Sequence, residues 1–276
     1  MDSFRIIGER VAGLLYGILR TSKAGSNPSR LSLSRAKIAV CVRGVKTKRA
    51  AVTTASPANQ AKAVLAELTK LSSAKVRDGM GRYGLPNDKA LGVPVGAIQK
   101  LGKKLGRDQA LAEALWKTDV YEARLLAAFV GEPAKLTPKL MDAWCRDFDN
   151  WGVVDTVCFK LFDQSPHGWS RVEKWARLKG EQQKRAGFVM LACLAAHADD
   201  VPDAQFREFL PLIEWGAADE RNFVKKGVSW ALRMVGRQSP AMRKECLELA
   251  RQLAASDDPA KRWVGKEALR DLGKIS

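Results

Sequence analysis

The sequence predicts an all-α fold built from helix pairs that repeat along the chain. Apolar residues recur at helical spacing in almost every segment after residue 57. The breaks between these segments carry Gly, Pro, Asp or Ser, which start and stop helices. No alternating apolar and polar pattern is long enough to predict a strand. These three observations exclude the α/β and all-β fold classes.

The expected helices follow one another along most of the chain. They occupy residues 58–73, 108–119, 120–131, 138–148, 169–179, 181–198, 203–216, 219–236, 239–256 and 258–273. The shortest of them has room for about three turns, which is the usual length of a helix in a globular protein.

A short pattern recurs within these helices. An exposed basic residue followed closely by small apolar residues is expected in YEARLLAAF, QKRAGFVML, VKKGVSWAL and KRWVGKEAL. Arg185 precedes Lys226 by 41 residues, and Lys226 precedes Arg262 by 36. Helix pairs repeating at about 40 residues predict a HEAT-like α-α superhelical solenoid. If the second helix of each pair lines the concave face, these cations form a basic DNA-binding groove; the alternative is ordinary surface cations without a common face.

The chain divides by composition into two parts. Residues 1–56 hold eleven Lys and Arg side chains against Asp2 and Glu9, a net charge of +9. They combine one amphipathic stretch with Ser-rich and Arg-rich sequence, so we expect a disordered extension. A transit peptide, a DNA-tethering arm and a mis-assigned start site all fit it. Residues 57–276 form the predicted helical repeat domain, with a net charge of +8. Both parts favour a polyanionic partner, unless the charge only maintains solubility.

Several functional classes find no support. No apolar run is long enough to span a membrane. The five cysteines include no CxxC pair, and only two histidines are present, so we expect neither a metal site nor a cofactor. The motifs of phosphate-binding loops, serine hydrolases, zinc proteases and dinucleotide-binding folds are absent from the sequence. His167 lies in a turn-like segment, and Cys145 and Cys158 read as small core residues.

The segment DNWGVVDTV, residues 149–157, places a carboxylate in an apolar helix. Trp151 and Asp155 are four residues apart and therefore share one helix face. Asp155 lies between Val154 and Val157, where an unpaired carboxylate is costly to bury. It therefore either pairs with a neighbouring helix for structural reasons or performs chemistry.

Two further residues point to the same surface. Trp230, in GVSWALR, follows Arg185 by 45 residues, about one repeat. It can therefore stand on an adjacent parallel helix and face the same groove. The structural alternatives are a core indole for Trp230 and a solvated charge for Arg185.

The order of these motifs resembles the AlkD-type DNA alkylation repair family, which consists of HEAT-repeat DNA glycosylases that remove alkylated purines. The motifs are WxxxD at 151–155, WxxxxxxxxxRA from Trp175 to Ala186, and FVKKGVSWALR at 223–233. Upstream, GRYGLPNDKALGVPVGAIQKLGKKLG and ALWKTDVYEARLLAAFV are similar to the N-terminal half of the family. The resemblance covers residues 76–272.

The resemblance implies a role at each matching position. Asp155 matches the catalytic carboxylate, and Trp151 and Trp230 match aromatics that contact the lesion nucleotide. The residues expected to contact the DNA backbone are Arg185, Lys225, Lys226 and Arg233. Two positions depart from the pattern: Gly152 replaces a polar residue that is often found there, and Gln182 replaces an aromatic. These departures concern the shape of the cleft more than the chemistry.

We therefore expect a monofunctional glycosylase that hydrolyses the N-glycosidic bond of cationic alkylated purines, N3-alkyladenine and N7-alkylguanine, in duplex DNA. The resemblance implies an open groove and no base flipping. The alternatives are a non-catalytic HEAT-repeat binder of unusual DNA structures and a protein–protein scaffold. We expect a monomer without membrane contact. Its location would be cytoplasmic and associated with the nucleoid in a bacterium, or organellar or nuclear if residues 1–56 are genuine.

Overall fold

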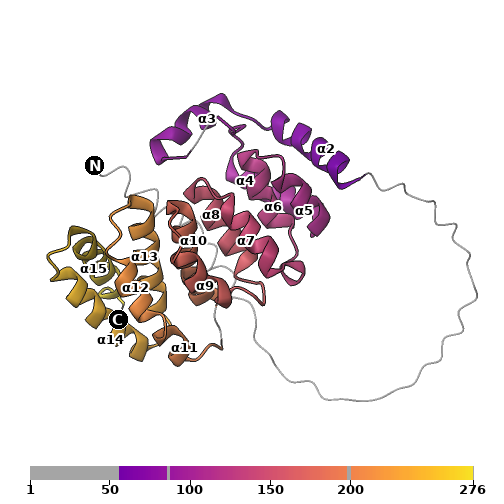
Figure 1. Cartoon of the computed structure of the whole chain (residues 1–276). Helices are drawn as coiled ribbons and strands as arrows, with labels where there is room; N and C mark the ends of the chain where they lie inside the picture. Colours follow the sequence, from indigo (N-terminus) through magenta and orange to yellow (C-terminus); the bar gives the residue numbers. More distant parts are fainter. Residues whose placement is uncertain (1–55, 86–87, 198–199, 276) are drawn as a thin grey trace, which may run out of the picture. The chain divides into compact units, whose positions relative to one another are not determined.

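The structure, a computed structural model, describes residues 56–85, 88–197 and 200–275 (Figure 1). All regular elements in these ranges are helices, and none is a strand. The predicted all-α fold is confirmed. The extension predicted for residues 1–56 lies outside the described residues, apart from Ser56, which caps the first described helix.

The helices follow the expected order. They are α2 (Pro57–Lys70), α3 (Ala74–Met80), η1 (Gly81–Tyr83), α4 (Val95–Leu105), α5 (Gln109–Trp116), α6 (Tyr121–Val130), η2 (Pro133–Lys135), α7 (Pro138–Arg146), α8 (Trp151–Val157), η3 (Cys158–Phe162), α9 (Trp169–Ala176), α10 (Glu181–His197), α11 (Asp203–Arg207), α12 (Leu210–Gly216), α13 (Asn222–Val235), α14 (Pro240–Ala254) and α15 (Pro259–Leu272). No helix of the described part is long and apolar enough to cross a membrane.

Local sequence sets the starts of several helices. Ser56, Thr137, Ser239 and Asp258 each stand directly before a proline, and each side chain accepts a hydrogen bond from a first-turn backbone N–H. A polar N-cap satisfies a donor that has no partner within the helix, and proline at the first helical position lacks that donor altogether. The sequence therefore fixes where these helices begin.

The helices pack as successive pairs. Helices α5 and α6, α9 and α10, α12 and α13, and α14 and α15 contact one another within their pairs. The second helices of these pairs, together with α8, also contact one another in sequence: α6 with α8, α8 with α10, α10 with α13 and α13 with α15. We call α6, α8, α10, α13 and α15 the second-helix row. Each pair thus buries its apolar face against the next, as repeat architectures require.

The core runs between the helices of each pair. Phe162, Trp175 and Phe188 are among its largest fully buried side chains. A Cβ atom on Gly187 of α10 would lie 2.2 Å from the backbone nitrogen of Ala176 on α9. Only glycine permits this close approach, which fixes α10, the longest of the described helices, against its partner.

Three local features differ from the expected pattern. The helix expected at residues 203–216 is interrupted, because α11 ends at Arg207 and α12 begins at Leu210 with Pro211 in its first turn. Helices α3 and α4 lie outside the expected set. In addition, η3 is a π-helix that directly continues α8. Such wide turns occur often at functional sites.

Candidate functional site

Helix α8 carries Asp155 into the interior of the second-helix row. The Asn150 side chain caps this helix and accepts a hydrogen bond of 3.0 Å from the backbone N–H of Val153. Because α8 packs against both α6 and α10, most of its residues are buried. Asp155 itself is only 8% exposed. A carboxylate at this depth requires a charged or hydrogen-bonding partner.

Arg185 of α10 is that partner. Its Nε lies 2.9 Å from Oδ1 of Asp155, and one terminal nitrogen lies 2.8 Å from Oδ2. The other terminal nitrogen donates to the carbonyl oxygen of Phe223 at 2.6 Å. The guanidinium therefore joins α8, α10 and the start of α13. Two parallel charge-assisted hydrogen bonds are a strong and orientation-specific arrangement.

Burial and the partner Arg185 have opposite effects on the pKa of Asp155. Burial raises the pKa of Asp155 above its ordinary value, while the charge of Arg185 and its hydrogen bonds oppose that rise. The same site raises the pKa of Tyr121, because its phenol is buried and lies near the carboxylates of Glu122 and Asp155. Arg185 thus provides the counter-charge that the expected role of Asp155 requires.

Trp151 stands one turn before Asp155 and is held in place at its edge. Its indole Nε1 donates to the carbonyl oxygen of Tyr83, which follows α3, at 2.8 Å. The ring remains partly exposed. A tryptophan whose N–H is fixed in this way has a defined ring orientation.

Gly152 follows Trp151, where a polar residue was expected from the resemblance, and close packing explains why a glycine stands there. A Cβ atom on Gly152 would lie 2.7 Å from the Tyr121 hydroxyl oxygen and 2.9 Å from Cδ2 of Leu85. A Cβ atom on Gly84 would lie 2.9 Å from the ring of Phe223. The segment of residues 83–85 therefore lies against both α8 and the start of α13.

Gln182, the second departure, also has a distinct environment. It lies one turn before Arg185 on α10, and its side-chain oxygen is buried without a hydrogen-bond partner among the described residues. Its neighbour Gln183 donates to the carbonyl oxygens of Arg146 and Phe148. A buried acceptor without a donor is costly, so this position is suited to a water molecule or a ligand donor.

Lys226 of α13 lies beside the buried pair. Its ammonium is about half-buried, and its pKa is lowered by that burial and by the nearby charges of Arg185 and Lys225. No carboxylate lies within ion-pair distance of Lys226 in the ranges that the structure describes. The site therefore has positive charge that Asp155 does not compensate, and such charge favours an anion such as a phosphate.

The other candidates on α13 are Lys225, Trp230 and Arg233. The Lys225 ammonium lies over the ring of Trp263, 5.4 Å from its centroid. The Arg233 side chain donates to the Ser229 carbonyl oxygen at 3.2 Å and approaches Asp271 at 3.9 Å. Trp230 follows Phe223, whose carbonyl contacts Arg185, by seven residues, which corresponds to about 10 Å along the helix axis. The structure thus gathers Asp155, Arg185, Trp151 and Lys226. Trp230 lies one turn after Lys226 on the same face of α13.

The recurring cations do not all share one role. Arg124 of α6 forms an ion pair with Asp119 at 2.6 Å and stacks over the ring of Trp116. Arg262 of α15 donates to carbonyl oxygens of the turn that precedes its own helix. All four repeat cations lie on second helices, but Arg124 and Arg185 are buried and not exposed as expected, because both pair with carboxylates. Arg262 thus stabilises its own repeat, and Arg124 also contacts Asp147 and Asp149 in the following one, so the recurring cations are partly structural.

Sequence reasoning missed three contributors to this site. Phe223 and Tyr83 contribute backbone carbonyls, which leave no trace in side-chain chemistry. Tyr121 contributes a hydroxyl that limits the space at Gly152. Tyr121 is the first residue of the YEARLL motif. A glycine three residues before Asp155 was the available signal for close packing at this point of α8.

The remaining sequence candidates lie apart from this site. His167 lies in a turn, and its backbone N–H donates to Ser165. Burial raises the pKa of the Cys145 thiol to about 12, which excludes a reactive thiolate there at neutral pH. No group of three potential metal ligands exists among the described residues.

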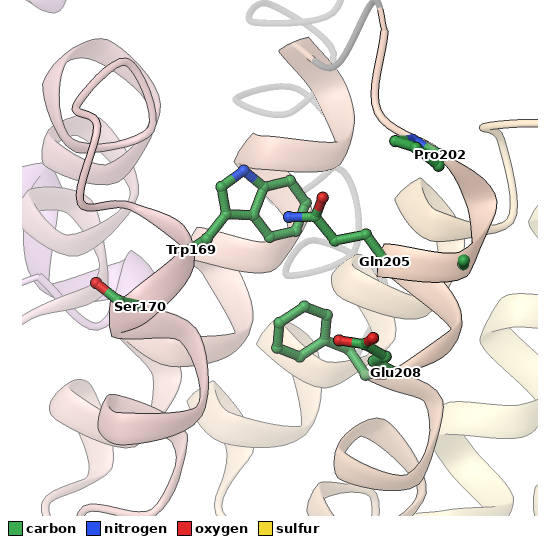
Figure 2. A pocket seen from close by; sticks show the side chains of 7 residues that line it. Trp169, Ser170, Pro202, Gln205 and Glu208 are labelled. Atoms are coloured by element: carbon green, nitrogen blue, oxygen red, sulfur yellow. The ribbon is translucent and has the colours of Figure 1, made fainter.

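A hollow of about 560 Å³ opens elsewhere, between α9 and the segment around α11. Figure 2 shows side chains from both segments turned toward it, among them Trp169, Gln205 and Glu208. None of its lining residues lies on the second-helix row. This hollow is therefore separate from the Asp155 site.

Comparisons with known proteins agree with this geometry. A family model described as DNA alkylation repair enzyme matches residues 64–272. No curated protein sequence matches the chain. A solved structure, described as a new family of proteins related to the HEAT-like repeat DNA glycosylases with affinity for branched DNA structures, is similar with a TM-score of 0.65 and 21% identity, over 77% of this chain and 95% of that one. The predicted HEAT-like fold is thereby confirmed, and the chain belongs to the DNA alkylation repair enzyme family.

Proposed function

We propose that this protein is a DNA glycosylase that hydrolyses the N-glycosidic bond of cationic alkylated purines in duplex DNA. The observation that carries this proposal is the buried Asp155–Arg185 pair, which lies beside the partly exposed Trp151 and the uncompensated Lys226. Membership of the DNA alkylation repair family supports the reaction class.

The chemistry needs one carboxylate and no general acid. A purine alkylated at N3 or N7 is cationic, so it leaves as a neutral base when the bond from its ring nitrogen to C1′ breaks. Positive charge then develops on the deoxyribose, as in glycoside hydrolysis. The Asp155 carboxylate stabilises that charge and orients a water whose oxygen bonds to C1′ and whose proton is released. A base and an abasic sugar are the products.

The hydrogen bonds of Asp155 are compatible with this role. Each of its oxygens accepts one hydrogen bond from Arg185. A carboxylate oxygen has about two acceptor positions, so each retains one for a water. Arg185 holds the carboxylate in one orientation, and such preorganisation is the main source of electrostatic catalysis.

The surrounding residues suit a cationic nucleotide in DNA. The Trp151 ring, oriented by its bond to Tyr83, offers a π-face that attracts a cationic base by about 0.5–2 kcal/mol. In this proposal Lys226 contacts a phosphate beside Arg185, and Trp230 and Arg233 extend the contact along α13. This arrangement selects by charge and bond lability, so neutral lesions such as uracil or etheno-adducts should be poor substrates.

Base release from methylated duplex DNA tests this proposal. The wild-type chain should release N7-methylguanine, and Asp155→Asn should not, while it still folds and binds DNA. Asp142→Asn is the matched control, because Asp142 also pairs with an arginine, Arg171, between two helices but lies outside the site. Equal loss of release in both variants would show that the effect is structural.

A second candidate is a non-catalytic binder of unusual DNA structures. The similar solved protein is described as having affinity for branched DNA, and the carboxylate of Asp155 is nearly buried. This candidate predicts tight binding of branched or duplex DNA by wild type and Asp155→Asn alike, with no base released. A protein–protein scaffold is less favoured, because the site offers uncompensated positive charge rather than an apolar or acidic face.

A further inference from the structure

Trp263 is an aromatic residue of α15 that is not among the buried residues of that helix. The helix buries Ala260, Val264, Gly265, Ala268 and Leu272. Trp263 lies at the edge of that face and is partly exposed, and the next residue on its own side of the helix, Lys266, is exposed. A partly exposed indole offers an aromatic surface on which a base can stack.

Lys225 completes a small composite surface with this ring. Its ammonium lies 5.4 Å from the centroid of the Trp263 ring. No carboxylate in the described part of the chain lies within ion-pair distance of Lys225. The pair therefore combines an aromatic face with a cation whose charge is not neutralised. A nucleotide carries the complementary groups, a base that stacks on aromatic rings and a phosphate.

The position of this pair relates it to the Asp155 site. Lys225 is adjacent in the chain to Lys226, which lies beside Arg185, and α13 packs directly against α15. Axes of packed helices are about 8–10 Å apart. Successive nucleotides of one strand rise by about 3.4 Å, so this distance corresponds to two or three nucleotides.

We propose that Lys225 and Trp263 form a binding site for an unpaired nucleotide of DNA. In an intact duplex both faces of every base are covered by neighbouring pairs, so Trp263 has nothing to stack on. At a bulge, gap or branch point one base is free, and it can stack on the indole while Lys225 contacts its phosphate. The inference rests on the proposed DNA binding along the second-helix row but is independent of base release.

The test uses DNA without an alkylated base, so that it does not depend on catalysis. Binding is compared between a duplex and the same duplex carrying one extrahelical 2-aminopurine. Stacking of a base on an aromatic side chain contributes about 1–3 kcal/mol, which corresponds to about a 5- to 150-fold change in affinity. Trp263→Ala should lose affinity for the bulged DNA by such a factor and change affinity for the duplex less than about twofold.

A matched control is a tryptophan of α12, a helix outside the second-helix row. Trp215 of α12 is 43% exposed and also lies against cations, Arg177 and Lys184. Trp215→Ala should therefore leave the preference for bulged DNA unchanged. Trp263→Phe should retain part of that preference, because a smaller ring still stacks. Equal loss on both DNAs, or no loss on the bulge, would overturn the inference.

Fluorescence of the wild-type complex provides a second readout that needs no variant. Stacking on an indole quenches 2-aminopurine, so binding should lower its emission below that of the free bulged DNA. A rise in emission on binding would mean that the extrahelical base does not stack on the protein, and this would also overturn the inference. Failure of N7-methylguanine release would contradict the glycosylase proposal without affecting either result.

Discussion

Replacement of Gly152 by alanine should destabilise the protein, although alanine is the better helix former. In a helix interior, alanine is favoured over glycine by about 0.5–1 kcal/mol. The added Cβ would, however, lie 2.7 Å from the Tyr121 hydroxyl oxygen and 2.9 Å from Leu85. Atoms cannot approach so closely, and overpacking of this kind costs about 1–3 kcal/mol. The steric effect is larger, and we expect a net loss of about 0.5–2 kcal/mol.

Urea denaturation at neutral pH measures this effect, and two variants separate its causes. Gly96→Ala, in α4, adds a methyl group where nothing lies within 4 Å, so it should be neutral or stabilising. Tyr121→Phe removes the hydroxyl that Gly152→Ala would meet, and the combined variant should recover part of the loss. Gly152→Ala should also release N7-methylguanine more slowly than wild type, because Asp155 lies on the same helix less than one turn from Gly152.

One pattern of results would refute this reasoning. If Gly152→Ala stabilised the protein as much as Gly96→Ala, and if Tyr121→Phe made no difference to it, then the start of α8 would not be tightly packed. The explanation of the glycine by the closeness of Tyr121 and Leu85 would then be wrong.

Three further predictions concern charge. Base release should fall on acidification at a pH above the ordinary carboxyl value of 3.8, because Asp155 must be ionised and burial raises its pKa; a pH profile with its acid limb at or below that value would contradict this. Asp219→Asn should cost about 1.5–3 kcal/mol at pH 7. The hydrogen bonds and charges of Arg221 and Lys184 lower the pKa of Asp219, so its stabilisation is present above the unfolded-state pKa and is lost as the pH falls below it. Urea titrations at pH 7 and pH 3 should therefore show a smaller effect of the substitution at pH 3. Lys226→Ala should weaken DNA binding independently of sequence and reduce the slope of log affinity against log salt concentration by about one, whereas Lys226→Arg should preserve that slope.

The sequence predicted the helices and their pairing because both depend on local pattern. Apolar spacing sets each buried face, and capping residues such as Thr137 and Asp258 set the boundaries. The break after Arg207 was not predicted, because apolar residues continue across it and proline is tolerated in the first turn of α12. The π-helix after α8 has no sequence signature.

The residues of the candidate site could be predicted from the sequence only where they contribute through their side chains. The pairing of Asp155 was one of two alternatives that the sequence left open, and the structure shows that Arg185 is the partner. Contacts through backbone carbonyls, such as those of Tyr83 and Phe223, depend on tertiary packing and could not be read from residue types. The direction of Lys225 toward Trp263 likewise depends on how α13 and α15 pack, although Lys226 is adjacent in the sequence.

The central claim is that the Asp155 carboxylate stabilises the developing charge during base loss. The most direct measurement is the single-turnover rate of N7-methylguanine release, with protein in excess over methylated duplex DNA. Asp155→Asn should lower this rate by about 100-fold or more, since removal of one preorganised electrostatic group costs about 10²–10³ in rate. Its affinity for the DNA should stay within about twofold of wild type. An unchanged rate in Asp155→Asn, or no release by wild-type protein that binds the DNA, would contradict the claim.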